Sequence, residues 1–76
     1  MERILSTDPP TVPLSPRQTE ILHLIVRGLS NPDISRLLGI SLDTVKEHIE
    51  TLFLKIGAAN RTEAVTIALR KHLLKT

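Results

Sequence analysis

The sequence lacks cysteine, tryptophan and tyrosine, and Phe53 is its only aromatic residue. The absence of cysteine excludes disulfide bonds, zinc sites built on thiolates, and thiol catalysis. The scarcity of aromatic side chains argues against proteins that stack RNA or single-stranded DNA bases on aromatic platforms. No apolar run approaches the roughly 18 residues of a membrane span, and the N-terminus has no signal-peptide core, so we expect a cytoplasmic protein without a membrane partner.

The remaining composition is that of a small folded domain. The chain has 76 residues, of which 41% are hydrophobic and 24% are charged. A chain of this length holds one domain of modest stability, and this balance of residues is not typical of a disordered segment. The formal net charge of +2 permits an anionic partner without requiring one.

The first part of the chain differs from the rest. Pro9, Pro10 and Pro13 remove backbone donors, and no apolar period runs through this part. We therefore interpret residues 1–13 as a flexible proline-rich linker or arm, and residues 14–76 as a folded domain.

Helix start and stop signals divide that domain into four helices. The starts share a capping side chain, at Ser15, Ser30, Ser41 and Asn60. The stops that can be recognised share a glycine after an apolar run, at Gly28, Gly39 and Gly57. The predicted helices are 16–27, 31–38, 42–56 and 61–74. No segment alternates with a period of two, so the predicted fold class is all-α.

Apolar residues at three- and four-residue spacing predict which face of each helix forms the core. The predicted core residues are Ile21, Leu22, Leu24, Ile25, Ile34, Leu37, Leu38, Leu42, Val45, Ile49, Leu52, Phe53, Ile56, Ala64, Val65, Ala68 and Leu69. The last helix has further apolar residues outside this stripe, among them Ile67 and Leu74.

The segment from Asn31 to Ile56 is the most informative for function. A helix of about two turns ends at Gly39, and a second helix begins after Ser41. This is the spacing of a helix-turn-helix, in which the second helix can lie in the major groove of DNA. An ordinary corner between two helices has the same pattern, and the spacing alone does not distinguish them.

Short motifs along the chain add a family resemblance. In order they are LSPR (14–17), GLSN (28–31), IS (40–41), TVKEH (44–48), KIG (55–57) and NRTEAV (60–65). Together they resemble the LuxR-type (GerE-like) helix-turn-helix domain of bacterial transcription regulators, over Leu14 to about Leu73. The resemblance implies sequence-specific binding of double-stranded DNA by a four-helix module. Such a module occurs alone or as the output domain of response regulators and quorum sensors, and RNA polymerase is a further expected partner.

Three residues of the third predicted helix gain a role from this resemblance. Thr44 is expected to contact a phosphate, although local capping of the helix is an alternative. Lys46 corresponds to a lysine that reads the groove, and it is also placed to pair with Asp43 or Glu50 along the helix. Lys55 lies near the helix end, where a cation suits the helix dipole and could reach a phosphate.

The neighbouring helices supply further candidates. Ser30 and Asn31 place backbone amides at a helix N-terminus, which is a site suited to an anion. Arg61 and Glu20 are matched in the family, and we expect them to form an ion pair, with a phosphate contact by Arg61 as the alternative. His48 is expected to pack at the edge of the core.

One face of the third helix departs from the family. Its outward positions carry acidic residues followed by leucine, at Asp43, Glu47, Glu50 and Leu54. Acidic groups near phosphates lower affinity, although a glutamate can accept a hydrogen bond from cytosine N4 and so add specificity. Glu47 and Glu50 are therefore candidate base-reading residues. The alternative is a protein-interaction domain that keeps the fold with weak or lost DNA binding.

The fourth predicted helix is the expected site of a weak homodimer, which is the family's usual mode of pairing. Its surplus apolar and basic residues would form the contact, at Ile67, Arg70, Lys71 and Leu74. The sequence indicates neither an enzyme nor a cofactor, because it has no phosphate-binding glycine loop and no nucleophile beside a base. Its three histidines fall on separate predicted helices without ligand spacing, so no metal site is expected.

Overall fold

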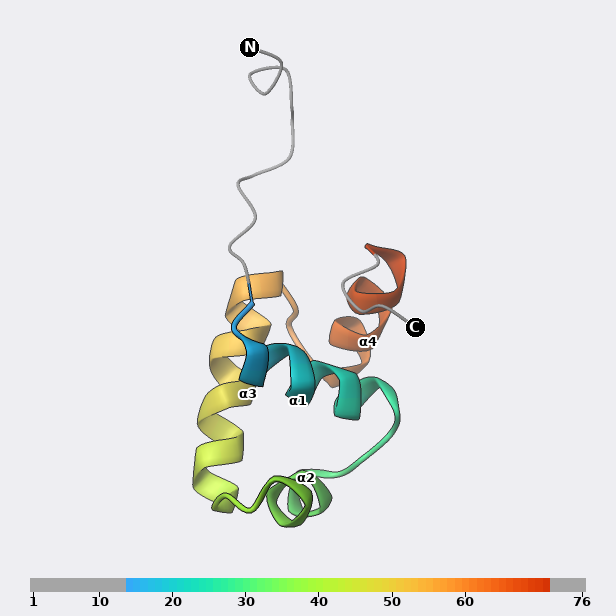
Figure 1. Ribbon diagram of the computed structural model, residues 1–76. Coiled ribbons are helices and arrows are strands. Elements are labelled where there is room, and N and C mark those ends of the chain that lie inside the picture. The colour runs from blue at the N-terminus through green and yellow to red at the C-terminus, as the bar shows by residue number, and fades with distance from the viewer. Residues whose placement is uncertain (1–13, 72–76) are drawn as a thin grey trace.

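The computed structural model describes residues 14–71, which form four helices and no strand (Figure 1). The helices are α1 (Pro16–Val26), α2 (Asn31–Leu38), α3 (Leu42–Ile56) and α4 (Arg61–Arg70). The all-α fold class and all four predicted starts are confirmed. The predicted end of the first helix is one residue too late. The fourth helix ends at Arg70 within the described residues, and positions 72–74 of its predicted range lie outside them.

The helices begin where their own side chains cap them. Ser15 Oγ accepts a hydrogen bond from the Gln18 amide at 3.1 Å, and Gln18 Oε1 accepts one from the Ser15 amide at 2.9 Å. Ser30 and Asp33 close a second reciprocal pair at the start of α2. These capping boxes satisfy amides that have no partner within a helix, so the sequence signals correspond to real contacts.

The boundary between α2 and α3 is set by a glycine and a serine. Gly39 ends α2 with φ of 70°, a left-handed conformation that side chains with a Cβ rarely adopt. Ser41 then caps α3 by accepting a hydrogen bond from the Thr44 amide at 3.1 Å. Two helices are thereby joined through a very short turn.

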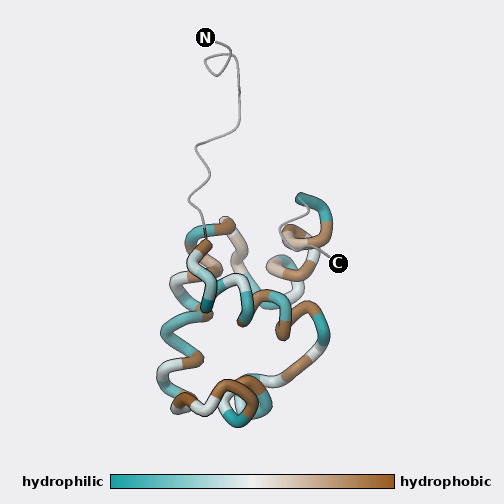
Figure 2. Tube along the Cα trace, in the orientation of Figure 1, coloured by the Kyte–Doolittle hydropathy of each residue, from teal (hydrophilic) through white to brown (hydrophobic). Residues whose placement is uncertain are grey.

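α1 holds the domain together. It crosses the middle of the domain in Figure 1, with α3 on one side and α4 on the other, and it packs against both. α2 lies at the lower end and packs on α3. Hydrophobic and hydrophilic stretches alternate along the helices in Figure 2, as expected where each helix buries one face.

The core consists of aliphatic side chains from all four helices. Its fully or nearly buried members are Ile21, Leu22, Ile25, Ile34, Val45, Ile49, Leu52, Ala64 and Ala68. Other predicted core residues pack against it while partly exposed, among them Leu24, Leu38, Phe53, Ile56 and Val65. The predicted core is therefore largely confirmed.

Three predicted core leucines are exposed instead. Leu37 is 62% exposed because the short helix α2 buries Ile34 and partly buries Leu38, which leaves Leu37 at the edge of that stripe. Leu69 is 56% exposed because it lies about 100° round α4 from the buried Ala68. Leu42 is 38% exposed in the first turn of α3, at the end of an otherwise buried stripe.

Candidate nucleic-acid interface

α2 and α3 form a helix-turn-helix whose turn is closed by hydrogen bonds. The amides of Gly39 and Ile40 both donate to the carbonyl of Ser35, at 2.9 and 3.2 Å. The Ser35 hydroxyl donates back to the carbonyl of Ile40. These bonds leave the turn little freedom, so α3 is held at a fixed angle to α2 and the predicted helix-turn-helix is present.

The outward face of α3 carries the predicted stripe. Asp43, Glu47 and Glu50 are exposed, and Leu54 is 83% exposed. Val45, Ile49 and Leu52 fill the opposite face and are buried, so the helix is anchored on one side and open on the other.

Lys46 is exposed beside this stripe. In the described part of the chain, no carboxylate lies within 4.0 Å of its ammonium group, so the predicted pairing with Asp43 or Glu50 is not formed. The ammonium group is therefore open to an external anion or to a hydrogen-bond acceptor on a base.

Thr44 takes part in the cap of α3. Its hydroxyl oxygen accepts a hydrogen bond from the Ser41 hydroxyl at 2.9 Å, while its amide donates to Ser41 Oγ. The local capping expected as an alternative is thus present. Because the Thr44 hydroxyl acts only as an acceptor in this contact, its own proton remains available to a phosphate oxygen.

Lys55 is partly buried and is bound within the domain. Its ammonium group donates to Gln18 Oε1 at 3.0 Å, which joins the end of α3 to the first turn of α1. Gln18 is only 7% exposed, and the same Oε1 also accepts the Ser15 amide. Because a neutral amide leaves the charge of Lys55 uncompensated, the lysine keeps its attraction for an anion.

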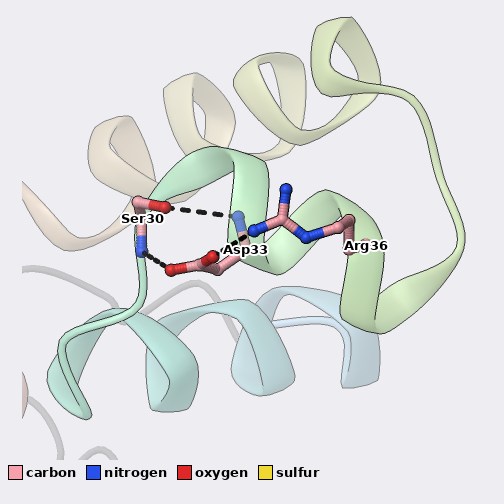
Figure 3. A network of polar contacts seen from close by, with 3 residues as sticks. All are labelled: Ser30, Asp33 and Arg36. Atoms are coloured by element: carbon pink, nitrogen blue, oxygen red, sulfur yellow. Dashed lines mark hydrogen bonds and ion pairs between the residues drawn. The ribbon is translucent and has the colours of Figure 1, made fainter.

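The N-terminus of α2 is largely satisfied from within. Figure 3 shows that the Asp33 carboxylate accepts the Ser30 amide and contacts Arg36, while the Asp33 amide donates to Ser30 Oγ. Pro32 has no amide proton. Among the amides in the first turn of α2, this leaves only that of Asn31 free within residues 14–71, so of the two predicted anion-binding residues Ser30 already has an internal partner and Asn31 does not.

The Asp33 carboxylate is stabilised in its ionised form. The pKa of Asp33 lies below its ordinary value, chiefly because the hydroxyl and amide of Ser30 hydrogen-bond to the carboxyl group. The nearby guanidinium of Arg36 lowers the pKa further. The start of α2 therefore already holds an anion, supplied by the chain itself.

Arg61 joins the start of α4 to the loop before α2. It donates to Asn31 Oδ1 at 2.8 Å and to the carbonyl of Leu29 at 2.6 Å. The predicted ion pair between Glu20 and Arg61 is wrong, because Glu20 pairs with Arg17 along α1 at 3.5 Å. Neither bond of Arg61 could be found from helical spacing, because its acceptors are far away along the chain.

His48 is half-buried at the edge of the α3 core face, as predicted. Within the described range, no three acidic, histidine or cysteine side chains lie together as a metal site would require. None of the described helices combines the length and the hydropathy needed to cross a membrane.

The predicted dimer contact is only partly within the described residues. Arg70 and Lys71 are exposed at the end of α4, and Ile67 is half-buried. Leu74 lies outside the described residues. Leu69 supplies exposed apolar surface on α4 that the sequence pattern had assigned to the core.

Residues 12–68 match a family described as bacterial regulatory proteins, luxR family (GerE). The chain belongs to the LuxR family. The predicted resemblance is therefore confirmed, and the chain contains the helix-turn-helix domain of LuxR-type transcriptional regulators.

Relatives within the LuxR family extend well beyond this domain. The transcriptional activator protein BjaR1 of Bradyrhizobium diazoefficiens is 36% identical over 75 residues, which are 97% of this chain and 31% of BjaR1. The crystal structure of ChrA, a response regulator in a heme-sensing two-component system, superposes with a TM-score of 0.79 at 39% identity, covering 97% of this chain and 35% of ChrA.

A second solved structure is the VqmA–ligand–DNA complex of Vibrio cholera. It superposes with a TM-score of 0.74 at 29% identity and covers 91% of this LuxR-family chain and 32% of that chain. The chain thus spans about a third of the length of these relatives.

Proposed function

We propose that this LuxR-type domain binds double-stranded DNA in a sequence-specific manner as the output domain of a transcription regulator, with α3 in the major groove. The observation that carries the proposal is the charged, unobstructed face of α3 on a rigid helix-turn-helix, with the Lys46 ammonium open to solvent. An exposed helix of this kind fits the dimensions of the major groove. The DNA in the VqmA complex supports the same assignment.

The proposed contacts divide into phosphate and base contacts. Lys46 would read a base edge, and the free hydroxyl proton of Thr44 would bind a phosphate. The unpaired amide of Asn31 would bind a second phosphate at the start of α2. Lys55 would approach a phosphate from its position on Gln18, and its charge would act over a short distance even without direct contact.

Ser30 and Arg61 would act indirectly. The Ser30 amide is already bound to Asp33, so this residue would position α2 and not contact DNA. Arg61 would hold Asn31 in place through the hydrogen bond to Oδ1, although its charge also favours a nearby phosphate. The proposal therefore places both residues beside the interface, where they position α2 and Asn31.

Glu47 and Glu50 would supply specificity at a cost in affinity. Each carboxylate is exposed on the outward face of α3 and can accept a hydrogen bond from cytosine N4. The negative charges would repel the backbone of any duplex, so non-specific binding should be weak. Discrimination between sites would then depend on a small number of base contacts.

The larger assembly is also part of the proposal. Two copies would pair weakly through α4, with Ile67, Arg70, Lys71 and Leu74 in the contact, on a site with two half-sites. Residues 1–13 would link the domain to a further part of a regulator such as a receiver domain. The regulator would act in the cytoplasm, where its DNA lies, with RNA polymerase as a further partner and with no catalytic step of its own.

Binding to a preferred duplex, selected from a random library and measured at several salt concentrations, tests the central claim. We expect affinity to fall as the salt concentration rises. Lys46→Gln should reduce the slope of log affinity against log salt concentration by about one counterion. Arg27→Gln is the charge-matched control, because Arg27 is exposed at the end of α1 and is assigned no DNA contact. Absence of salt-dependent binding would favour the protein-interaction alternative, which the acidic face of α3 supports.

Pairing through α4 has its own test. Sedimentation with and without a duplex carrying two half-sites should show two protomers per duplex and mostly single protomers without DNA. One protomer per duplex at all concentrations would contradict the proposed pairing.

A further inference from the structure

Leu54 is the most exposed of the large hydrophobic residues in the described part of the chain. Its exposed fraction is 83%, whereas Leu37, the next, is 62% exposed. An isolated exposed leucine is unremarkable on most surfaces. Leu54, however, lies on the face of α3 that the proposed function places against base edges.

The position of Leu54 on that face follows from helix geometry. Successive residues are about 100° apart around an α-helix, so Leu54 lies about 20° from Glu47 and about 40° from Glu50. The buried residues Ile49 and Leu52 lie on the other side of the helix. Leu54 therefore points in nearly the same direction as the two glutamates.

We propose that Leu54 is a specificity-determining residue that contacts the 5-methyl group of a thymine. This inference rests on the proposed insertion of α3 into the major groove. Among the groups that base pairs present there, the thymine methyl is the apolar one, and the others are hydrogen-bond donors and acceptors. A leucine side chain cannot bind those polar groups, but it gains free energy by covering a methyl group.

The distance along α3 from Glu50 to Leu54 predicts how far the contacted thymine lies from the base pairs that the two glutamates would contact. Leu54 is four residues beyond Glu50, a rise of about 6 Å, while base pairs in a duplex are about 3.4 Å apart. The contacted thymine should therefore lie about two base pairs beyond the pair read by Glu50, on the side away from the pair read by Glu47.

Replacing single thymines by deoxyuridine tests this contact, because the change removes only the methyl group. A preferred duplex is first selected from a random library with the unaltered protein, and each thymine is then replaced in turn. We expect one replacement to weaken binding about fourfold, the value for one buried methyl-sized group. Leu54→Ala should bind the thymine and deoxyuridine forms of that site equally.

Leu37→Ala is the matched control. Leu37 is also an exposed leucine, but it lies at the end of α2 and outside the proposed base-reading face. The fourfold effect of deoxyuridine should persist in this variant. Melting curves followed by circular dichroism should show both variants folded, because both side chains are mostly exposed.

The possible outcomes separate the two proposals. If the unaltered protein selects a duplex but no thymine replacement weakens binding, the role of Leu54 is overturned and the proposed function stands. The same holds if Leu54→Ala retains the full deoxyuridine effect. If the unaltered protein binds no duplex at all, the proposed function fails, and the role of Leu54 fails with it.

Discussion

The ammonium group of Lys55 and the amide oxygen of Gln18 are joined by a hydrogen bond of 3.0 Å between residues 37 positions apart in the chain. The bond links the last turns of α3 to the first turn of α1. It leaves the charge of Lys55 uncompensated, because Gln18 is neutral. When a negative charge is introduced at position 18, the stability of the domain should therefore rise while its affinity for DNA falls.

Gln18→Glu should stabilise the domain and weaken its binding to DNA. Glutamate keeps both acceptor contacts, suits the positive end of α1, and adds an ion pair with Lys55, together worth about 0.5–1 kcal/mol. The same charge reduces the attraction of Lys55 for a phosphate, so the salt dependence of binding should become shallower.

Urea unfolding and binding curves on one duplex measure the two effects of that substitution. Thr19→Glu is the control, because it adds the same charge at the next position of α1 without occupying the capping position. The argument fails if Gln18→Glu and Thr19→Glu change binding equally.

Arg61→Lys should destabilise the domain despite keeping the positive charge. The guanidinium donates to both Asn31 and Leu29, and a lysine cannot reproduce this forked geometry. We expect a loss of about 1–3 kcal/mol in unfolding free energy, and a similar loss for Arg61→Met. An Arg61→Lys variant as stable as the unaltered protein would show that the forked hydrogen bonds to Asn31 and Leu29 contribute little to stability.

The hydrogen bonds to Asp33 predict a loss of stability in acid. Because the pKa of the folded state lies below that of the unfolded state, the ionised carboxylate stabilises the domain above the unfolded value. This stabilisation is lost as the pH falls through the folded-state pKa, below about pH 4. Asp33→Asn should therefore have a flatter profile of melting temperature against pH on the acid side.

Arg36→Gln refines the assignment of that pH effect to Asp33. This substitution removes only the smaller contribution to the lowered pKa of Asp33, which comes from the Arg36 guanidinium, and it leaves the hydrogen bonds from Ser30 intact. The acid-side slope should therefore decrease only partly. Identical slopes for the unaltered protein and Asp33→Asn would show that these hydrogen bonds do not favour the ionised carboxylate.

Ser41→Ala should lower stability through the cap of α3. The Ser41 hydroxyl accepts the Thr44 amide, and loss of such a cap costs about 0.5–2 kcal/mol. Thr51→Ala is a suitable control, because Thr51 is exposed in the interior of α3 and alanine favours helix. Equal melting temperatures for Ser41→Ala and the unaltered protein would contradict the importance of this cap.

Alanine at Glu47 or Glu50 should relax base preference at one position. If either carboxylate accepts a hydrogen bond from cytosine, its removal should reduce discrimination there by about 1–3 kcal/mol. Affinity for random DNA should rise slightly, because a repulsive charge is removed. Binding curves on single-base variants of one preferred site, at two salt concentrations, measure both effects.

Lys46→Ala provides the contrast to these glutamate substitutions. Its loss should weaken binding, most strongly on the duplex whose base Lys46 contacts, and removal of its positive charge should flatten the salt dependence. If both glutamate variants merely shift all curves in parallel, neither residue reads a base.

The features that could be predicted from the sequence are those set by neighbouring residues. Ser15 and Gln18, like Ser30 and Asp33, are three positions apart, so their capping contacts follow from helix geometry. The exposed face of α3 follows in the same way from residues such as Glu50 and Leu54. Local spacing therefore located the helices and the candidate base-reading surface.

The contacts that could not be predicted join distant parts of the chain. Arg61 reaches Asn31 across 30 positions, and helical spacing carries no information about such a pair. Leu37 and Leu69 show a second limit of sequence patterns, because both are predicted to be buried and both are exposed. A periodic pattern identifies apolar residues on a helix, but which of them a neighbouring helix covers depends on tertiary packing.

The hydrogen bonds that close the turn at Ser35 and Ile40, and the caps of α2 and α3, are all contained between residues 30 and 58. As an excised peptide, this segment would keep all the capping residues that determine where its two helices begin and end. It would nevertheless leave Ile34, Val45 and Leu52, which are fully buried in the domain, facing water. This segment thus supplies its own capping and turn hydrogen bonds but cannot bury its own apolar side chains. Transplanting it to another scaffold requires a replacement for the apolar surface of α1.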